Sequence, residues 1–493
     1  MKIPRLLLSA VLALFAIGQP VAGLADSSTN TVWHYTLLPG SYLIDDCDIC
    51  GPPTIPIPMQ GVFRMRLIGC DPLFCDYACE VSFSAQSLAG TYYAVEGNGR
   101  YRIGGEVIAL QSLTLAAYTD PGHTNGIRYF TNTSSTIERL WPMIKISLDQ
   151  TNPTPIHHFH MEISAAPMRE IWFSTRAGLT AGIWQPPTNQ ISGGDLISSA
   201  ARLVKRNREL TAQLGIMGPV PDLGLKDTDV LPGGEIAFSV EADSFSERLG
   251  PLTQGDLLSD RGRVLFTNAQ LIAAFKPGAS AGNVGLDAVQ VLDSGEVYFS
   301  TQRNFVSQAL GQKIGSGDLL SSRGGILRKN ADLLARFYPA DPRQDYGLSA
   351  FYVWPSGEIW FATETGFADI NSRSYLSGDL LSDQGYVVYR NLELVAPFQP
   401  LEDLINFGLD GMWVITDVTA SPPAARCLAI VPDAASGDVV LDYADPGRVW
   451  QLERSLTPGG PWLPVSPTTT DVPLTDRGIL KLLPQAFYRL RQW

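Results

Sequence analysis

Charged residues are scarce in this chain, at 17% of 493 residues, and they lean acidic. Lys and Arg number 36 and Asp and Glu number 49, so the formal net charge is −13. An acidic surface repels phosphate backbones, which argues against a nucleic-acid partner. Glycine (46) and proline (35) are plentiful but follow no period. Their pattern excludes collagen and favours a turn-rich β protein.

Catalytic and cofactor-binding motifs are also few. The chain has 5 histidines and 6 cysteines. Neither a Walker A pattern nor a His-Glu-x-x-His pattern occurs. Gly97-Asn98-Gly99 lacks the following helix that a dinucleotide site needs. The sequence therefore assigns no catalytic residue.

Long hydrophobic runs are missing after the N-terminus. Leu6–Ile17 is apolar except for Ser9, and Lys2 and Arg5 precede it. This run is too short for a membrane span, which takes about 20 residues. Small residues follow, up to Ala25, so we predict a cleaved secretory signal over 1–25, with an uncleaved anchor as the alternative. We expect a secreted or cell-surface protein, extracellular or periplasmic, without a transmembrane anchor.

The clustering of the cysteines is consistent with a secreted protein. Five of them lie in one short window and are disulfide candidates: Cys47, Cys50, Cys70, Cys75 and Cys79. The sixth, Cys427, is far away. An oxidising compartment favours disulfides. A half zinc site or a redox pair at Cys47-x-x-Cys50 is the alternative, although the proline-rich stretch after it does not suit a thioredoxin-like motif.

Residues 27–160 alternate apolar and polar side chains in short runs, without a sustained helical period. Asn98-Gly99 between two such runs predicts a hairpin turn. Many short antiparallel strands predict an N-terminal β-sandwich that carries the cysteine cluster.

The middle of the chain repeats itself four times. A Gly-Asp-Leu-Leu/Ile-Ser segment begins at 194, 255, 317 and 378, at offsets of 61, 62 and 61 residues. The same offsets relate four asparagines and four Gly-Leu pairs: Asn207, Asn268, Asn330 and Asn391, and the pairs that begin at 224, 285, 347 and 408. Three markers in one register establish an internal repeat.

Each unit reads as about four strands, which is typical of a propeller blade. We predict a β-propeller-like domain of four or five blades over 161–415. A leftover strand at 409–415 would complete the first blade and close the ring. An open solenoid or a row of sheets is the alternative.

The tail at 425–493 follows a linker at 416–424. It contains Leu452-Glu453-Arg454-Ser455, a Pro-Trp-Leu-Pro-Val segment over 461–465, and Phe487-Tyr488-Arg489-Leu490. Over about 65 residues it resembles the small fibronectin type III-like modules that end many secreted bacterial proteins. The resemblance implies a β-sandwich used for adhesion or spacing. The whole chain is thus expected to be all-β.

Two sets of repeated residues are candidate sites. Equivalent acids could converge on a ring axis and bind a cation such as calcium, although each could instead cap a turn: Asp195, Asp256, Asp318 and Asp379. Aromatic residues in the variable segments could stack on sugars or anchor a protein, although each could instead fill its own blade: Trp184, Phe245, Phe305, Phe367 and Tyr375.

These features predict a secreted, non-enzymatic binding or adhesion protein that presents propeller loops to an extracellular glycan or protein. The alternative is a secreted carbohydrate-active enzyme with a carboxylate pair in the axial pocket. Four acids that break the repeat symmetry would be its candidates, without an assigned pair: Asp227, Asp229, Glu364 and Asp369.

Overall fold

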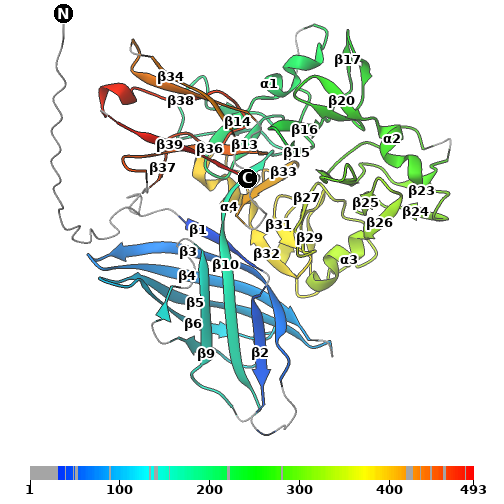
Figure 1. Ribbon diagram of the computed structural model, residues 1–493. Helices are drawn as coiled ribbons and strands as arrows, with labels where there is room; N and C mark the ends of the chain where they lie inside the picture. The colour runs from blue at the N-terminus through cyan, green and yellow to red at the C-terminus, as the bar shows by residue number, and fades with distance from the viewer. Residues whose placement is uncertain are drawn as a thin grey trace, which may run out of the picture.

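The computed structural model describes residues 32–38, 40–47, 49, 54–87, 90–132, 135–137, 143–154, 156–218, 222–278, 281–417, 426–433, 435–444, 447–458, 462–483 and 485–493. The predicted signal segment, Cys50 and most of the linker lie outside these residues. The described chain is built from antiparallel strands with short helices (Figure 1), which confirms the all-β class.

The N-terminal region forms a closed barrel, where we expected a two-sheet sandwich. Each of eight strands pairs antiparallel with the next, and the last pairs with the first. Closure leaves no edge exposed among these strands. In order they are β1 (Val32–Leu37), β3 (Ile57–Cys70), β4 (Phe74–Gln86), β5 (Tyr92–Gly104), β6 (Leu110–Tyr118), β7 (Arg128–Thr131), β9 (Ile144–Gln150) and β10 (His158–Phe173). β2 (Tyr42–Asp46) pairs with β3 and β10, and β8 (Ser135–Thr136) pairs with β6.

The hairpin turn predicted at Asn98-Gly99 is wrong, because β5 runs straight through these residues. Gly97 and Gly99 instead lie against β6. A Cβ atom on Gly99 would come within 2.0 Å of the Thr114 carbonyl oxygen, and one on Gly97 within 2.2 Å of the Ala116 carbonyl oxygen. Glycine inside a strand often marks such a close approach of backbones.

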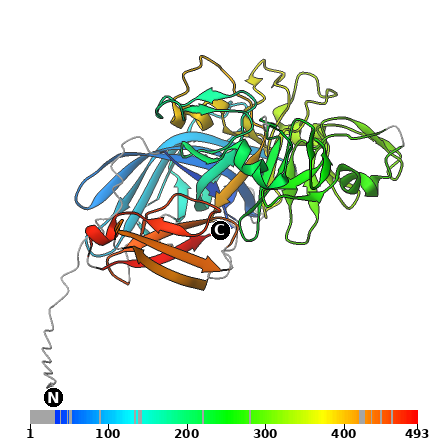
Figure 2. The same cartoon turned by 90° about the horizontal axis from the view of Figure 1, so that it is seen from above.

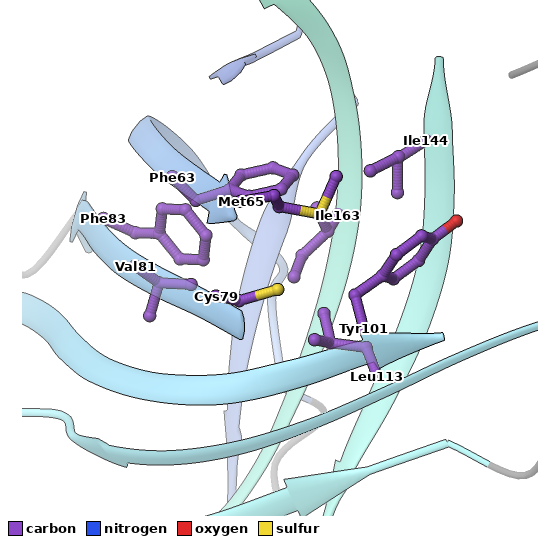
Figure 3. Close-up of a pocket in the computed structure, with 9 residues that line it drawn as sticks. All are labelled: Phe63, Met65, Cys79, Val81, Phe83, Tyr101, Leu113, Ile144 and Ile163. Atoms are coloured by element: carbon purple, nitrogen blue, oxygen red, sulfur yellow. The ribbon is translucent and has the colours of Figure 1, made fainter. Parts of the chain in front are cut away.

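Apolar side chains fill the barrel (Figure 3). The void among them measures about 10 Å³, room for about one water molecule, so it is too small to be a ligand cavity. Its lining is Phe63, Met65, Cys79, Val81, Phe83, Tyr101, Leu113, Ile144 and Ile163.

The cysteine predictions are met in part. Cys70 and Cys75 form a disulfide where β3 turns into β4. Cys47 is also disulfide-bonded. The prediction for Cys79 is wrong: its side chain points into the barrel core as a free thiol, and burial raises its pKa to about 12. Cys427 is a free, exposed thiol.

One strand joins the barrel to the rest of the molecule. The first part of β10 pairs with β9, β2 and β1. Its last residues pair with β33 (Met412–Thr416) on one side and β13 (Leu196–Ser198) on the other. β10 therefore crosses the boundary predicted between 160 and 161, and the barrel and the repeats share it.

Each repeat contributes a four-stranded antiparallel sheet. The sheets run β33-β10-β13-β14, β15-β16-β19-β20, β21-β22-β25-β26 and β27-β28-β31-β32. The strand predicted over 409–415 is β33, and it completes the first sheet. The remaining bounds are β14 (Arg202–Lys205), β15 (Asp227–Leu231), β16 (Glu235–Ser239), β19 (Leu257–Ser259), β20 (Arg263–Phe266), β21 (Val289–Val291), β22 (Val297–Phe299), β25 (Leu319–Ser321), β26 (Gly325–Arg328), β27 (Ala350–Val353), β28 (Ile359–Ala362), β31 (Leu380–Ser382) and β32 (Tyr386–Tyr389).

The first strands of these sheets lie around one axis. β15 contacts β21, β21 contacts β27, β27 contacts β33, and β33 contacts β15. We call this assembly the four-sheet ring. Buried aromatic and aliphatic side chains fill the spaces between neighbouring sheets.

The ring has two unlike ends. Short turns join the third strand to the fourth in every sheet, and the first to the second in all but the sheet that β33 completes, so they lie at one end. The longer connections begin at the other end, which we call the long-connection end, and some of them reach back to the short turns, as where Arg248 donates to the Gly262 carbonyl. The longer connections are four small hairpins and four short helices with 3₁₀ extensions: β11 (Leu179–Thr180) with β12 (Gln190–Ile191), β17 (Ser244–Ser246) with β18 (Gly250–Leu252), β23 (Phe305–Ser307) with β24 (Gln312–Ile314), β29 (Phe367–Ala368) with β30 (Ser374–Tyr375), then α1 (Asn207–Thr211), η1 (Ala212–Leu214), α2 (Asn268–Ile272), η2 (Ala273–Phe275), α3 (Asn330–Leu334), η3 (Ala335–Phe337), α4 (Asn391–Val395) and η4 (Ala396–Phe398).

Two three-stranded sheets end the chain and lie beside the ring and the barrel in both views (Figures 1 and 2). They contact the short-turn end: Arg448 donates to the Val230 carbonyl and lies 2.5 Å from Asp293 Oδ1. The strands are β34 (Arg426–Asp433), β35 (Asp438–Ala444) and β38 (Leu474–Asp476), then β37 (Leu463–Pro464), β36 (Trp450–Ser455) and β39 (Phe487–Gln492); η5 (Ile479–Lys481) follows β38. In the part of the chain described, no helix is long and apolar enough to cross a membrane.

Candidate axial site

The residue after each Gly-Leu pair lies one or two positions before a first strand, near the ring axis. These four equivalent positions differ: Lys226, Asp287, Ser349 and Asp410. The glycine of each pair has a positive φ, +73° at Gly347, which favours glycine. A Cβ atom on Gly347 would lie 2.5 Å from the Glu364 Cβ atom. The missing side chain therefore lets the connection after the second strand approach the axis.

Charged side chains that follow the Gly-Leu pairs meet charged side chains of the connections after the second strands, at the long-connection end. We call Arg176, Lys226, Asp287, Glu364 and Asp410 the axial cluster. Lys226 Nζ lies 3.2 Å from Glu364 Oε1, 3.5 Å from Asp287 Oδ1 and 3.9 Å from Asp410 Oδ2. Arg176 pairs with Glu364 and lies 2.9 Å from Asp410 Oδ1. A single ammonium group thus faces three carboxyl groups.

Burial and neighbouring charges together shift the pKa values of this cluster. Asp287 is fully buried, and neither of its carboxyl oxygens accepts a hydrogen bond from a described residue. Burial first, and then the negative charge of Glu364, raise the pKa of Asp287 to about 8. Burial also raises the pKa of Asp410. Burial alone would lower the pKa of Lys226, but Asp287, Asp410 and Glu364 outweigh it and raise that pKa.

Two further acids join neighbouring first strands beneath the cluster. Asp227 accepts hydrogen bonds from the backbone N–H groups of Val289 on β21 and Met412 on β33. Asp229 accepts one from the N–H of Val291, at 2.6 Å. Both acids are fully buried, and burial raises the pKa of each, to about 6 for Asp229. Their oxygens are occupied by the backbone of the ring, which points to a structural role.

Of the acids named for the enzymatic alternative, the axial cluster contains Glu364 alone. Asp369 lies in a hairpin and accepts the N–H groups of Asn371 and Arg373, each at 2.8 Å. The sequence reasoning missed Lys226, Asp287, Asp410 and Arg176. A signal for the first three was available: each follows a Gly-Leu pair that all four repeats share, at a position whose charge changes from copy to copy.

The prediction that the repeated aspartates converge on a cation is wrong. Each accepts the backbone N–H of the asparagine that begins the next helix; Asp256 Oδ1 lies 2.9 Å from Asn268 N. The other oxygen accepts an N–H three residues earlier, as from Thr253 at 2.9 Å. Each carboxylate therefore closes a turn within its own repeat. Among the described residues, no group of three or more His, Cys, Asp or Glu could hold a metal ion.

The aromatic residues do not form one exposed surface. Phe305, Phe367 and Tyr375 are buried, and all three pack on phenylalanines of the 3₁₀ turns. Trp184 is half-buried against Phe398. Phe245 alone of the five is exposed, because it stands one position beyond the inward residue of its hairpin, Ser244. A shift of one residue turns a strand side chain to the opposite face. The expectation of exposure fails for the three buried residues.

The sequence also contains a Gly-x-Ser-x-Gly pattern at 278–282. It lies between η2 and β21, not at the strand-to-helix turn where a hydrolase nucleophile sits. Ser280 itself is outside the described residues.

Comparisons with known proteins give little. No protein-family model and no curated protein match the chain. One solved structure, the extracellular domain of a hybrid two-component system from B. thetaiotaomicron, aligns with 78% of this chain at 10% identity and a TM-score of 0.18. This chain spans 53% of the length of that chain. A likeness this low carries no argument about fold or function.

Proposed function

We propose that the protein is a secreted, non-enzymatic binding protein whose long-connection end meets an extracellular protein. In this proposal the four-sheet ring is a four-bladed β-propeller, and the last two sheets are a fibronectin type III-like spacer. The Cys70–Cys75 disulfide supports an oxidising compartment. The C-terminal sheets occupy part of the short-turn end, and the barrel contacts η3 and α4, so we assign the partner to the exposed connections that remain.

Exposed apolar side chains at the long-connection end carry the proposal. Seven of them, from the connections of all four repeats, are more than half exposed: Met217, Phe245, Val306, Tyr338, Ile370, Leu401 and Ile405. Such residues mark interaction sites when they gather on one part of a surface. Four of the seven are aliphatic, one is a methionine, and two are aromatic. Sugars are recognised by exposed aromatic faces, so this surface favours a protein over a glycan.

The enzymatic alternative has weaker support. An acid that protonates a leaving group must reach the substrate. Asp287 has the raised pKa that such a role needs, but it is fully buried and Lys226 lies beside it. Asp227 and Asp229 are held by backbone N–H groups.

The test compares three proteins: the wild type, a triple variant Phe245→Ser, Val306→Ser and Ile405→Ser, and a control with Leu428→Ser and Leu482→Ser in the exposed C-terminal region. Each is incubated with the extracellular protein fraction of the source cells and cross-linked. A partner captured by the wild type and the control but lost from the triple variant supports the proposal, provided that cross-links map to the long-connection end.

A polysaccharide panel provides the counter-test. Retention on a polysaccharide, unchanged in the triple variant, would overturn the choice of a protein partner. Release of soluble sugar would overturn the non-enzymatic function and make the axial acids the next targets.

A further inference from the structure

We propose that Lys226 and Asp287 condense into an intramolecular isopeptide bond that links the start of the second sheet to the start of the third. The two residues occupy equivalent positions in neighbouring repeats. Lys226 Nζ lies 3.5 Å from Asp287 Oδ1. Lys226 is 9% exposed in its side chain and Asp287 is 0% exposed, so water has little access to the pair.

The choice of Asp287 over Asp410 follows from their partners. The Asp410 carboxylate accepts a hydrogen bond from Arg176 at 2.9 Å, and its nearer oxygen lies 3.9 Å from Lys226 Nζ. Asp287 accepts no hydrogen bond from a described residue. A buried carboxyl group without hydrogen bonds is costly. An amide would replace that carboxyl group and the buried ammonium by one neutral group.

Glu364 is placed to move the protons. Its Oε1 atom lies 3.2 Å from Lys226 Nζ. The acids around Lys226 keep it as an ammonium, so attack requires an acceptor for its proton, and Glu364 is the nearest carboxylate to the ammonium. The raised pKa of Asp287 makes its carboxylate a ready acceptor for that proton, and the protonated carboxyl is the form from which a hydroxyl can leave.

The reaction balances without an oxidant, a reductant or a second substrate. One proton passes from the Lys226 ammonium, by way of Glu364, to the Asp287 carboxylate. The free amine attacks Asp287 Cγ and the Nζ–Cγ bond forms. Glu364 then takes a second proton from Nζ and gives it to the departing hydroxyl as the Cγ–O bond breaks. An ammonium and a carboxylate become one amide and one water.

The test is the intact mass of the mature chain after denaturation and full reduction. We expect the wild type to lack the mass of one water molecule, and fragmentation to yield a branched peptide that joins Lys226 to Asp287. Lys226→Met and Asp287→Asn should each restore the full mass. Glu364→Gln should also restore it while both linked residues are still present.

Two controls separate the bond from general water loss. Glu241→Gln changes the exposed residue equivalent to Glu364 in the second repeat, and it should keep the mass deficit. Lys205 and Asp471, a pair at 2.5 Å whose carboxylate is exposed, should appear in unbranched peptides. A full-mass wild type, with Lys226 and Asp287 in separate peptides, would overturn the proposal whether or not any variant folds.

Discussion

Arg169 Nε lies 2.8 Å from Asp417 Oδ2, so a residue of the strand shared by barrel and ring is bonded to the residue that follows β33. The same carboxylate accepts hydrogen bonds from Arg491 at 2.8 Å and from the Trp493 indole at 2.9 Å. One acid thus joins the barrel, the ring and the last strand of the chain. Burial alone would raise the pKa of Asp417, but Arg169 and Arg491 outweigh it and hold that pKa below its ordinary value.

Asp417→Asn should loosen this junction. Loss of the charge weakens its hydrogen bonds to both arginines, at a cost of about 2 kcal/mol in the free energy of unfolding. Because the pKa of Asp417 is lowered by folding, its contribution is present above the unfolded value of about 3.9 and is lost as the pH falls through the folded pKa. Chemical denaturation and limited proteolysis measure both effects. Asp403→Asn, at an exposed position, should change neither; equal proteolysis of the two variants would contradict the prediction.

Phe305 and Phe245 test the register of the hairpins. Phe305 is buried against Phe275, with ring centroids 5.7 Å apart, whereas Phe245 faces solvent. Phe305→Ala should lower the free energy of unfolding by about 3–4 kcal/mol, because it opens a cavity. Phe245→Ala should change it by less than about 0.5 kcal/mol. Urea unfolding of the two variants measures both changes. Equal decreases in the free energy of unfolding would contradict the assigned register.

Sequence reasoning worked where a signal was repeated and failed where it was local. Four copies in one register predicted the four sheets and the returning strand β33. Barrel closure could not be foreseen, because it depends on pairing between β1 and β10, which are far apart in the sequence. The hairpin prediction at Asn98-Gly99 failed because the sequence does not distinguish a glycine that allows close approach of strands from one that allows a turn. The axial cluster was missed because the repeat was recognised from residues that its copies share. The cluster residues vary from copy to copy.

Asp256 tests whether the repeated aspartates are structural. Its two oxygens accept the N–H groups of Thr253 and Asn268. Asp256→Ala leaves both donors without this partner, so the free energy of unfolding should fall by about 3 kcal/mol. Neither EDTA nor calcium should shift the melting temperature of the wild type. A chelator-dependent fall in that temperature, absent from the variant, would restore the cation hypothesis.

Asp229 should make stability depend on pH with an unusual sign. Its pKa is raised to about 6 by burial, above an unfolded value of about 3.9. The native state therefore binds the extra proton between these values, so the free energy of unfolding should fall as the pH rises from about 4 to about 6. At 1.36 kcal/mol per pKa unit the fall is roughly 3 kcal/mol. Asp229→Asn should reduce the slope by this amount, whereas the part due to Asp227 and Asp410, whose pKa values burial also raises, should remain. Asp403→Asn should keep the full slope. Denaturation series at several pH values provide the measurement.

Lys276 should be a site where glycine stabilises the fold. It follows η2 with φ +47°, and the equivalent residues Tyr338 and Gln399 share this left-handed conformation at φ +49° and +50°. The first repeat has Gly215 there, at φ +69°. A left-handed conformation costs a non-glycine residue about 1–2 kcal/mol, and glycine loses roughly 0.5–1 kcal/mol through its freer unfolded chain.

The difference predicts that Lys276→Gly raises the free energy of unfolding by about 0.5–1 kcal/mol. Gly215→Ala should lower it by a similar or larger amount, because the new Cβ meets the same strain. Lys276→Ala controls for the loss of the lysine side chain and should change little. Urea midpoints compare all three variants. A gain in Lys276→Ala equal to that in Lys276→Gly would assign the effect to the side chain and not to the backbone conformation.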